Sequence, residues 1–231
     1  MTNCKIASGA NCLLSVLSGE ADEGLIPERL QTTGGEMLQR SEAPITDLYF
    51  PITAVISVVG HMSSGQTAEL GVIVNECAAG LIALMGAESA TYEKTVQVGG
   101  EVVRVPLYSA QREFDKGGEF QRAVHSCTQR FTQQVAQTLL CNRWHPVEQR
   151  LIRWLLMRHD RIKGDVIALT HEYIAHMLGA NRSTITQTAK RLQEAGYIKY
   201  AWGRVTIIDR EGLENNTCEC YGIIQKKYQE N

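Results

Sequence analysis

The stretch from Thr170 to Ile198 constrains the fold of this chain more than any other, because it predicts two helices separated by a tight turn. Gly179 lies between them, where a positive φ costs a glycine little. We expect Thr170 to cap the first helix, and Asn181 or Ser183 to cap the second. Apolar residues recur at helical spacing on both sides of the turn: Ile174, Ala175, Leu178, Ile185, Ala189 and Leu192. The pattern predicts a helix-turn-helix.

The outward side of the second predicted helix carries hydrogen-bonding and basic side chains, namely Arg182, Ser183, Gln187 and Lys190. Side chains of these types bind base edges and phosphates when a helix lies in the major groove of DNA. The plainer alternative is an ordinary helical hairpin, in which Lys190 and Arg191 form only a solvated face.

The residues that follow favour the DNA-binding interpretation. Residues 197–200 and 204–208 predict two short strands joined by a tight turn. A helix-turn-helix followed by a β-hairpin is a winged helix. Such a wing is expected to bring Lys199 or Arg204 near a DNA phosphate.

The charge of the chain is unevenly distributed. Between Asn142 and Arg210 there are 12 Lys and Arg against 6 Asp and Glu, a net charge of +6. Because the whole chain carries −2, the remainder carries −8. A basic segment beside an acidic one is typical of a DNA-binding module attached to a domain that does not bind DNA.

The run from Val147 to Leu213 resembles the C-terminal domain of the cyclic-AMP receptor protein / fumarate-nitrate regulator (CRP/FNR) family. Its members are bacterial transcription regulators that usually pair an N-terminal β-roll sensor with a long dimerisation helix and a winged helix. The resemblance is weaker over the sensor. It implies an α+β protein whose partners are double-stranded DNA with a palindromic operator, a second copy of the chain, and RNA polymerase.

The resemblance also implies roles for individual residues. Arg182 falls where the family has its base-reading arginine, and its fork suits O6 and N7 of guanine. Ser183 replaces a glutamate and Gln187 an arginine found in many members, so we expect the site read to differ from the common one. Phosphate contacts are expected from Thr170, Asn181, Thr184, Lys190 and Lys199.

The N-terminal half shows short apolar runs separated by turn residues, at 48–51, 54–59, 68–74, 95–98 and 102–105. This spacing predicts an all-β barrel or sandwich. In the resembling family this domain is the β-roll, a double-stranded β-helix of the cyclic-nucleotide-binding type. A short helix is expected before it, at residues 12–17.

The cyclic-nucleotide members of the family hold the cyclic phosphate with an arginine and the ribose with a glutamate. The corresponding segments here are residues 79–84 and 91–96. Alanine and glycine replace the Gly-Glu pair, and Tyr92 or Glu93 stands where the arginine belongs. Lys94 is nearby but lacks the guanidinium fork. We therefore expect the domain not to bind cyclic AMP in the usual mode, and the effector is unknown.

Residues 109–144 read as a long helix with an apolar seam near the 3.5-residue period of a two-stranded coil. The seam consists of Phe120, Val124, Cys127, Phe131, Val135, Thr138 and Cys141. We expect it to form a homodimer interface that places two recognition helices about 34 Å apart on DNA. The alternative is a helix packed on its own β domain. If Cys127 faces its twin, oxidation is expected to lock the dimer.

Pro146 is expected to end this helix and to mark a domain boundary. The predicted organisation is a sensor-like domain at 1–108, a dimerisation helix at 109–144, a winged helix at 145–213 and a tail at 214–231. The tail departs from the winged helix, and we expect it to fold back on the body or to be loose.

The seven cysteines are odd in number and scattered, which favours reduced thiols in a cytoplasm. No apolar run reaches the length of a membrane span, and no secretory signal is visible. Cys4 and Cys12 do not resemble an iron–sulfur motif. Cys218 and Cys220 lack a His/Cys pair at metal-site spacing, so we expect no metal and no cofactor.

An enzyme is not expected, and no catalytic residues are predicted. His61 is the only histidine before residue 125, which argues against a cupin-like metal site. No nucleophile–base pair or phosphate-binding loop is visible. Two alternatives to a plain DNA-binding regulator are kept: a regulator that senses another small molecule or the redox state, and a β-roll module that binds a protein.

Overall fold

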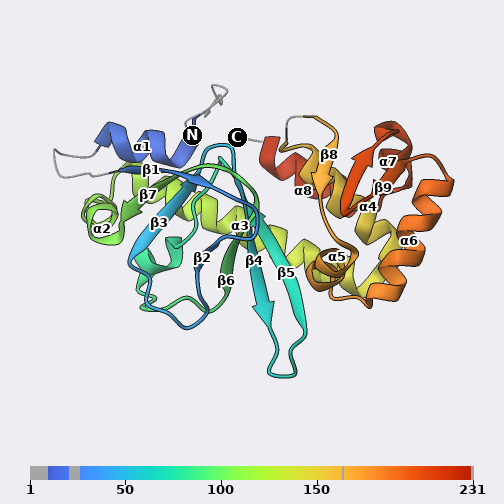
Figure 1. Cartoon of the computed structure of the whole chain (residues 1–231). Coiled ribbons are helices and arrows are strands. Elements are labelled where there is room, and N and C mark those ends of the chain that lie inside the picture. Colours follow the sequence, from blue (N-terminus) through green and yellow to red (C-terminus); the bar gives the residue numbers. More distant parts are fainter. Residues whose placement is uncertain (1–9, 21–26, 163, 230–231) are drawn as a thin grey trace. The chain divides into compact units, whose positions relative to one another are not determined.

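The computed structural model describes residues 10–20, 27–162 and 164–229, and it divides into two compact units (Figure 1). The first unit runs through Val59 and resumes from Gly71 to Gln134. The second holds Gly60–Leu70 and the chain from Val135 onward.

The first unit is built on two antiparallel sheets. One has the order β1-β7-β3, from Glu28–Thr32, Gly100–Pro106 and Asp47–Pro51. The other has the order β2-β6-β4-β5, from Met37–Gln39, Glu93–Val98, Val55–His61 and Thr67–Ile73. The five strands predicted from the apolar runs are all present, and β1 and β2 are additional.

The core of this unit lies between the sheets and the helices. Alternate residues of β3 and β7 point inward, as a half-buried sheet requires. The helices α1 (Cys12–Glu20), α2 (Leu107–Asp115) and α3 (Glu119–Trp144) cover them. Its buried members include Leu13, Leu17, Leu48, Phe50, Val103, Val105, Phe114 and Phe120. The expected helix at 12–17 is thus confirmed.

The segment that corresponds to the family's nucleotide cassette contains a short 3-10 helix, η1 (Leu81–Met85). Lys94 lies on β6, and its side chain is turned inward. Its Nζ donates a hydrogen bond to the Tyr92 carbonyl at 2.7 Å, and burial lowers the pKa of Lys94. The ammonium group of Lys94 is therefore held by a backbone carbonyl two residues earlier in the chain.

The apolar seam of α3 faces its own unit. Phe120, Val124 and Cys127 are at most 2% exposed and belong to the core just described. A Cβ on Gly71 of β5 would lie 3.0 Å from the Phe131 ring, so helix and strand approach closely there. The side chain of Gln134 also bonds to both backbone groups of Val72.

The members of the predicted dimer seam therefore pack within their own chain. Of the three that remain, Val135 is half-buried, and Thr138 and Cys141 are buried. The Cys127 Sγ contacts the Glu76 carbonyl at 3.1 Å and accepts from Arg130 at 3.2 Å, so it does not face a twin. A stripe of period 3.5 fits a helix on a sheet as well as a coiled coil, and the periodicity alone does not name the partner.

The second unit contains a winged helix. After α4 (Val147–His159) come β8 (Val166–Ala168), α5 (His171–Leu178), α6 (Arg182–Glu194), β9 (Ile198–Ala201) and β10 (Arg204–Ile207). The strands form an antiparallel sheet in the order β8-β10-β9. The two predicted wing strands are confirmed, while the three-residue β8 is too short to have been visible as a pattern.

The core of the second unit is centred on α4, which is buried along most of its length. Leu151, Trp154 and Leu155 are at most 2% exposed. Arg158 is buried as well, stacks over the Trp154 ring and pairs with Glu69 at 2.6 Å.

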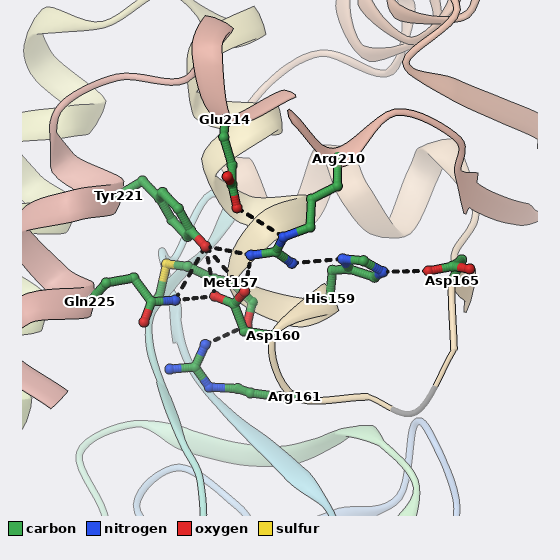
Figure 2. A network of polar contacts seen from close by, with 9 residues as sticks. All are labelled: Met157, His159, Asp160, Arg161, Asp165, Arg210, Glu214, Tyr221 and Gln225. Atoms are coloured by element: carbon green, nitrogen blue, oxygen red, sulfur yellow. Dashed lines mark hydrogen bonds and ion pairs between the residues drawn. The ribbon is translucent and has the colours of Figure 1, made fainter. Parts of the chain in front are cut away.

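The chain after the wing is ordered into two further helices, α7 (Arg210–Asn216) and α8 (Cys220–Gln229), which both pack on α4. Figure 2 shows the polar network that holds them. Asp160 accepts from Arg210 at 2.6 Å and from the Tyr221 hydroxyl at 3.1 Å, and also from Gln225. Burial, followed by the charge of Asp160, raises the pKa of Tyr221 to about 12. The expectation that the tail folds back on the body is confirmed for these residues.

The same network selects the tautomer of one histidine. Arg210 approaches Nδ1 of His159 at 2.7 Å, and a guanidinium only donates. His159 therefore accepts at Nδ1 and carries its proton on Nε2, which donates to Asp165 at 2.8 Å. The last turn of α4, the segment after it and α7 are joined in one chain of contacts (Figure 2).

Candidate nucleic-acid interface

The turn between α5 and α6 has the geometry that its sequence predicts. The Thr170 hydroxyl accepts from the Tyr173 amide at 3.1 Å, which confirms Thr170 as the N-cap of α5. Gly179 has φ 57° and ψ 44°, the left-handed conformation, and its amide bonds back to the last turn of the helix. A capping hydroxyl of this kind stabilises a helix by about 1 kcal/mol.

The second helix of the pair, α6, is amphipathic. Ile185, Ala189 and Leu192 are at most 4% exposed and pack inward. The outward positions are exposed, with Thr184 half-buried; they are Asn181, Arg182, Ser183, Thr186, Gln187 and Lys190. Asn181 is the N-cap by position, but its side chain makes no capping hydrogen bond. Its amide is thus available to another acceptor or donor.

A residue absent from the predicted site ties the helices to the wing. The His171 ring stacks on the Tyr200 ring of β9 with centroids 3.9 Å apart. Its Nδ1 lies 3.0 Å from the Thr186 hydroxyl, which donates to the Arg182 carbonyl. Because that hydroxyl has one proton, His171 must donate from Nδ1. Burial, and then the charge of Arg182, lower the pKa of His171.

His171 therefore sets the position of α6 relative to α5 and β9 as a neutral ring. Its place in the sequence, directly after the N-cap Thr170, gave no signal of this role, because the two partner residues come from later elements. Thr186 was likewise missed from the predicted site. Although it is exposed, its hydroxyl donates a hydrogen bond to the Arg182 carbonyl of the same helix.

The wing ends in a two-residue turn. Ala201 pairs with Arg204, and the residues between them, Trp202 and Gly203, have φ 53° and 70°. Positive φ at both positions is the type I′ turn that suits a hairpin. Trp202 is 99% exposed at the tip. A tryptophan whose backbone is in the left-handed region and whose side chain is almost fully exposed is unusual.

The basic side chains of the wing lie on one face. Lys199 pairs with Thr206 across the ladder, and Arg204 is two residues from Thr206 on the same strand. Lys199 and Arg204 thus project to the same side of the hairpin, and both are exposed. With Arg182, Lys190 and Arg191 on α6, the helix-turn-helix and its wing present five exposed Lys and Arg side chains.

Known proteins of this architecture match the chain. Residues 149–215 match the family of Crp-like helix-turn-helix domains. No curated protein matches the chain. Solved structures do: FixK2 from Bradyrhizobium japonicum is 16% identical, with a TM-score of 0.69, over 84% of this chain and 98% of that one.

Two further structures are similar over comparable lengths. A CRP-family transcriptional regulator from Thermus thermophilus is 20% identical, with a TM-score of 0.70, over 82% of this chain and 95% of that one. The c-di-GMP responsive global regulator CLP from Xanthomonas campestris is 14% identical, with a TM-score of 0.65, over 84% of this chain and 97% of that one.

The chain therefore has the fold of the CRP/FNR transcription regulators, and its residues 149–215 match the family of Crp-like helix-turn-helix domains. The resemblance and the predicted α+β architecture are confirmed. Among the described helices, none combines the length and hydropathy that crossing a membrane requires.

Proposed function

We propose that the protein is a sequence-specific DNA-binding transcription regulator that acts as a homodimer and not as an enzyme. The observation that carries this proposal is the exposed face of α6, on which Arg182, Ser183 and Gln187 follow one another at the helix start. Arg182 reads a guanine, Gln187 reads an adenine, and Ser183 takes the place of a longer side chain.

The surrounding groups hold the helix on the duplex. Asn181 and Thr184 lie at the start of α6, and Thr170 lies at the start of α5. Together with Lys190 and Lys199 they contact phosphates, which sets the register of the helix without reading sequence. The operator is palindromic because two symmetric copies of the site read it.

The homodimer forms through the outward face of α3 near its end, and not through the seam predicted from the sequence. Leu139, Leu140 and Trp144 are 68%, 51% and 71% exposed, and Ala136 lies on the same side. Large apolar side chains gathered on one helix face are typical of a protein interface.

The β unit of this regulator does not bind cyclic AMP in the usual mode. Ala79 and Gly80 stand in place of the family's Gly-Glu pair, and Tyr92 or Glu93 in place of its arginine. Lys94, which is nearby, is held by the Tyr92 carbonyl. Control by another small molecule, and contact with RNA polymerase in the cytoplasm, remain part of the proposal.

Selection of bound duplexes from a random pool tests this function. We expect enrichment of a two-fold symmetric sequence with half-sites about one helical turn apart. Adding cyclic AMP is expected to leave both the sequence and the affinity unchanged. Recovery of no consensus from the pool at low salt would refute sequence-specific recognition.

A further inference from the structure

Four potential metal ligands converge in the second unit, away from the DNA-facing helices. Cys141 lies in the last turn of α3 and His145 directly follows that helix, with the His145 amide bonded to the Cys141 carbonyl at 3.0 Å. Cys218 and Cys220 flank Glu219, Cys218 in the link between α7 and α8 and Cys220 as the first residue of α8. The ligand atoms of all four residues lie within 4.8 Å of one another.

The spacing of these atoms fits a single tetrahedral ion. The Sγ atoms of Cys141 and Cys218 are 3.6 Å apart, and the Cys220 Sγ is 3.6 Å from Nδ1 of His145. Zinc–sulfur bonds of about 2.3 Å place two thiolates of a tetrahedron about 3.8 Å apart. Thiolates that hold a four-iron cluster each bind a different iron and lie farther apart.

The second nitrogen of the imidazole is also accounted for. Nε2 of His145 lies 3.0 Å from a carboxylate oxygen of Glu219, the residue between the two cysteines. A carboxylate on the far nitrogen of a histidine ligand fixes the ring and its tautomer, and leaves the near nitrogen free for a metal. The Gln137 amide donates a hydrogen bond to the Cys220 Sγ at 3.0 Å. Such a donor stabilises the negative charge of a metal-bound thiolate.

The site is closed. The three cysteines are at most 3% exposed, and the His145 side chain is 16% exposed. Four protein ligands with little solvent access are typical of a structural zinc site, whereas a catalytic site keeps a position open.

Two buried cations complete the electrostatics. Arg150 and Arg153 of α4 are buried, and both act on Cys141 through their charge. The Nε of each has no hydrogen-bond partner in the described part of the chain. Three thiolates around a divalent ion carry a net charge of −1, which these guanidiniums offset.

We propose that Cys141, His145, Cys218 and Cys220 form a structural Zn²⁺ site that fastens the α7–α8 link to the end of α3. Three buried thiols alone would pack as small apolar groups. That alternative does not explain why a histidine with a carboxylate on its far nitrogen turns its near nitrogen toward them. The site lies directly before Pro146, where α3 gives way to α4.

Metal analysis of the purified full chain tests the site. We expect about one zinc ion per chain by mass spectrometry of the acid-digested protein. Replacement by Co²⁺ is expected to give thiolate-to-cobalt charge-transfer bands and the intense visible bands of a tetrahedral ion. Removal of zinc is expected to lower the thermal midpoint by roughly 5–10 °C, as a ligand bound only by the native state does.

Variants identify the ligands. Cys218→Ser and Cys220→Ser are each expected to abolish stoichiometric zinc, and His145→Gln to weaken its retention against a chelator. Cys127→Ser is the matched control, since it removes another buried cysteine of α3 that lies outside the group. It is expected to keep its zinc.

Because a cysteine variant can fail to fold, the wild-type chain is also titrated with an organomercurial in the presence of a zinc indicator. Zinc release that follows modification of the thiols supports the site. Three results overturn it: a chain that takes up no zinc, a cobalt spectrum without charge-transfer bands, or acid-labile sulfide, which indicates a cluster.

Discussion

Two exposed helix faces of the second unit differ in their chemistry. The outward face of α6 carries Arg182, Ser183 and Gln187 at its start and Lys190 farther on. The outward face of α3 near its end carries Leu139, Leu140 and Trp144 instead. The α6 face offers hydrogen-bond donors and positive charge, and the α3 face offers apolar area. Both helices are amphipathic, with apolar residues on the buried side.

The difference indicates two kinds of partner. A polyanion with hydrogen-bonding base edges complements the α6 face, because basic side chains bind phosphates and polar side chains bind bases even in a hydrated interface. A second apolar surface complements the α3 face, because burying a leucine side chain stabilises by about 1.5–3 kcal/mol. Substitutions on one face at a time therefore report on one kind of partner each.

The largest effect is expected from charges on the α3 face. Leu139→Asp combined with Leu140→Asp places carboxylates where an apolar interface would bury them. We expect the dimer to dissociate in sedimentation velocity. Affinity for a palindromic duplex is expected to fall by about 100-fold or more, because each half-site then binds alone.

Ile208→Asp is the control for the sedimentation measurement, because Ile208 is a 60% exposed apolar residue that does not lie on α3. It is expected to remain dimeric. A double variant that also sediments as a dimer would show that this face of α3 is not the interface.

A smaller effect, confined to one DNA sequence, is expected from Arg182→Ala. Loss of a bidentate contact to guanine is expected to cost about 1–3 kcal/mol at the selected site, with a smaller loss on random duplex. Fluorescence anisotropy on both duplexes measures the two losses. Equal losses on the two would mean that Arg182 contacts phosphate and not a base.

Lys190→Ala is expected to weaken binding to both duplexes alike. One phosphate contact fewer should flatten the slope of log K against log salt by about 1. In the free chain the Nζ of Lys190 lies 3.7 Å from the Oε1 of Glu194. Both side chains are exposed, so this ion pair adds little to the stability of the fold. Glu194→Gln is the matched control and is expected not to weaken binding; an unchanged slope for Lys190→Ala would remove it from the interface.

The α6 face was predictable from the sequence, while the α3 face was not. The N-cap Thr170, the turn residue Gly179 and the buried Ile185 lie within one short stretch, and each acts through local geometry. The stripe through Phe120 and Val124 was equally visible, but a period specifies a side and not the partner. Its partner is the chain's own β core.

The cysteine group was missed for a related reason. Cys141 and Cys218 are separated by 77 positions, and only the folding of α7 and α8 onto α4 brings them together. A local search for ligand spacing reads Cys218 and Cys220 as a pair without a complement. The i, i+4 pair of Cys141 and His145 was the available signal, since such residues share a helix face.

The smallest expected effect concerns His171, which joins α5, α6 and the wing. Its pKa is lowered, by burial first and by the charge of Arg182 second, from an ordinary value of about 6.5. The unfolded chain therefore binds more protons at this residue than the folded chain does just below pH 6.5. Stability from a neutral His171 is present above that value and is lost as the pH falls.

Urea unfolding of the wild type and of His171→Gln, at pH 7.5 and pH 5.5, isolates this contribution, because all other titrating groups are common to both chains. The wild type is expected to lose more of its stability between the two pH values than the variant does. The amide keeps a donor for Thr186 but cannot gain a proton. Identical pH dependence in the two chains would mean that the stacked ring is protonated in the fold at no cost, and that Arg182 exerts no field on it.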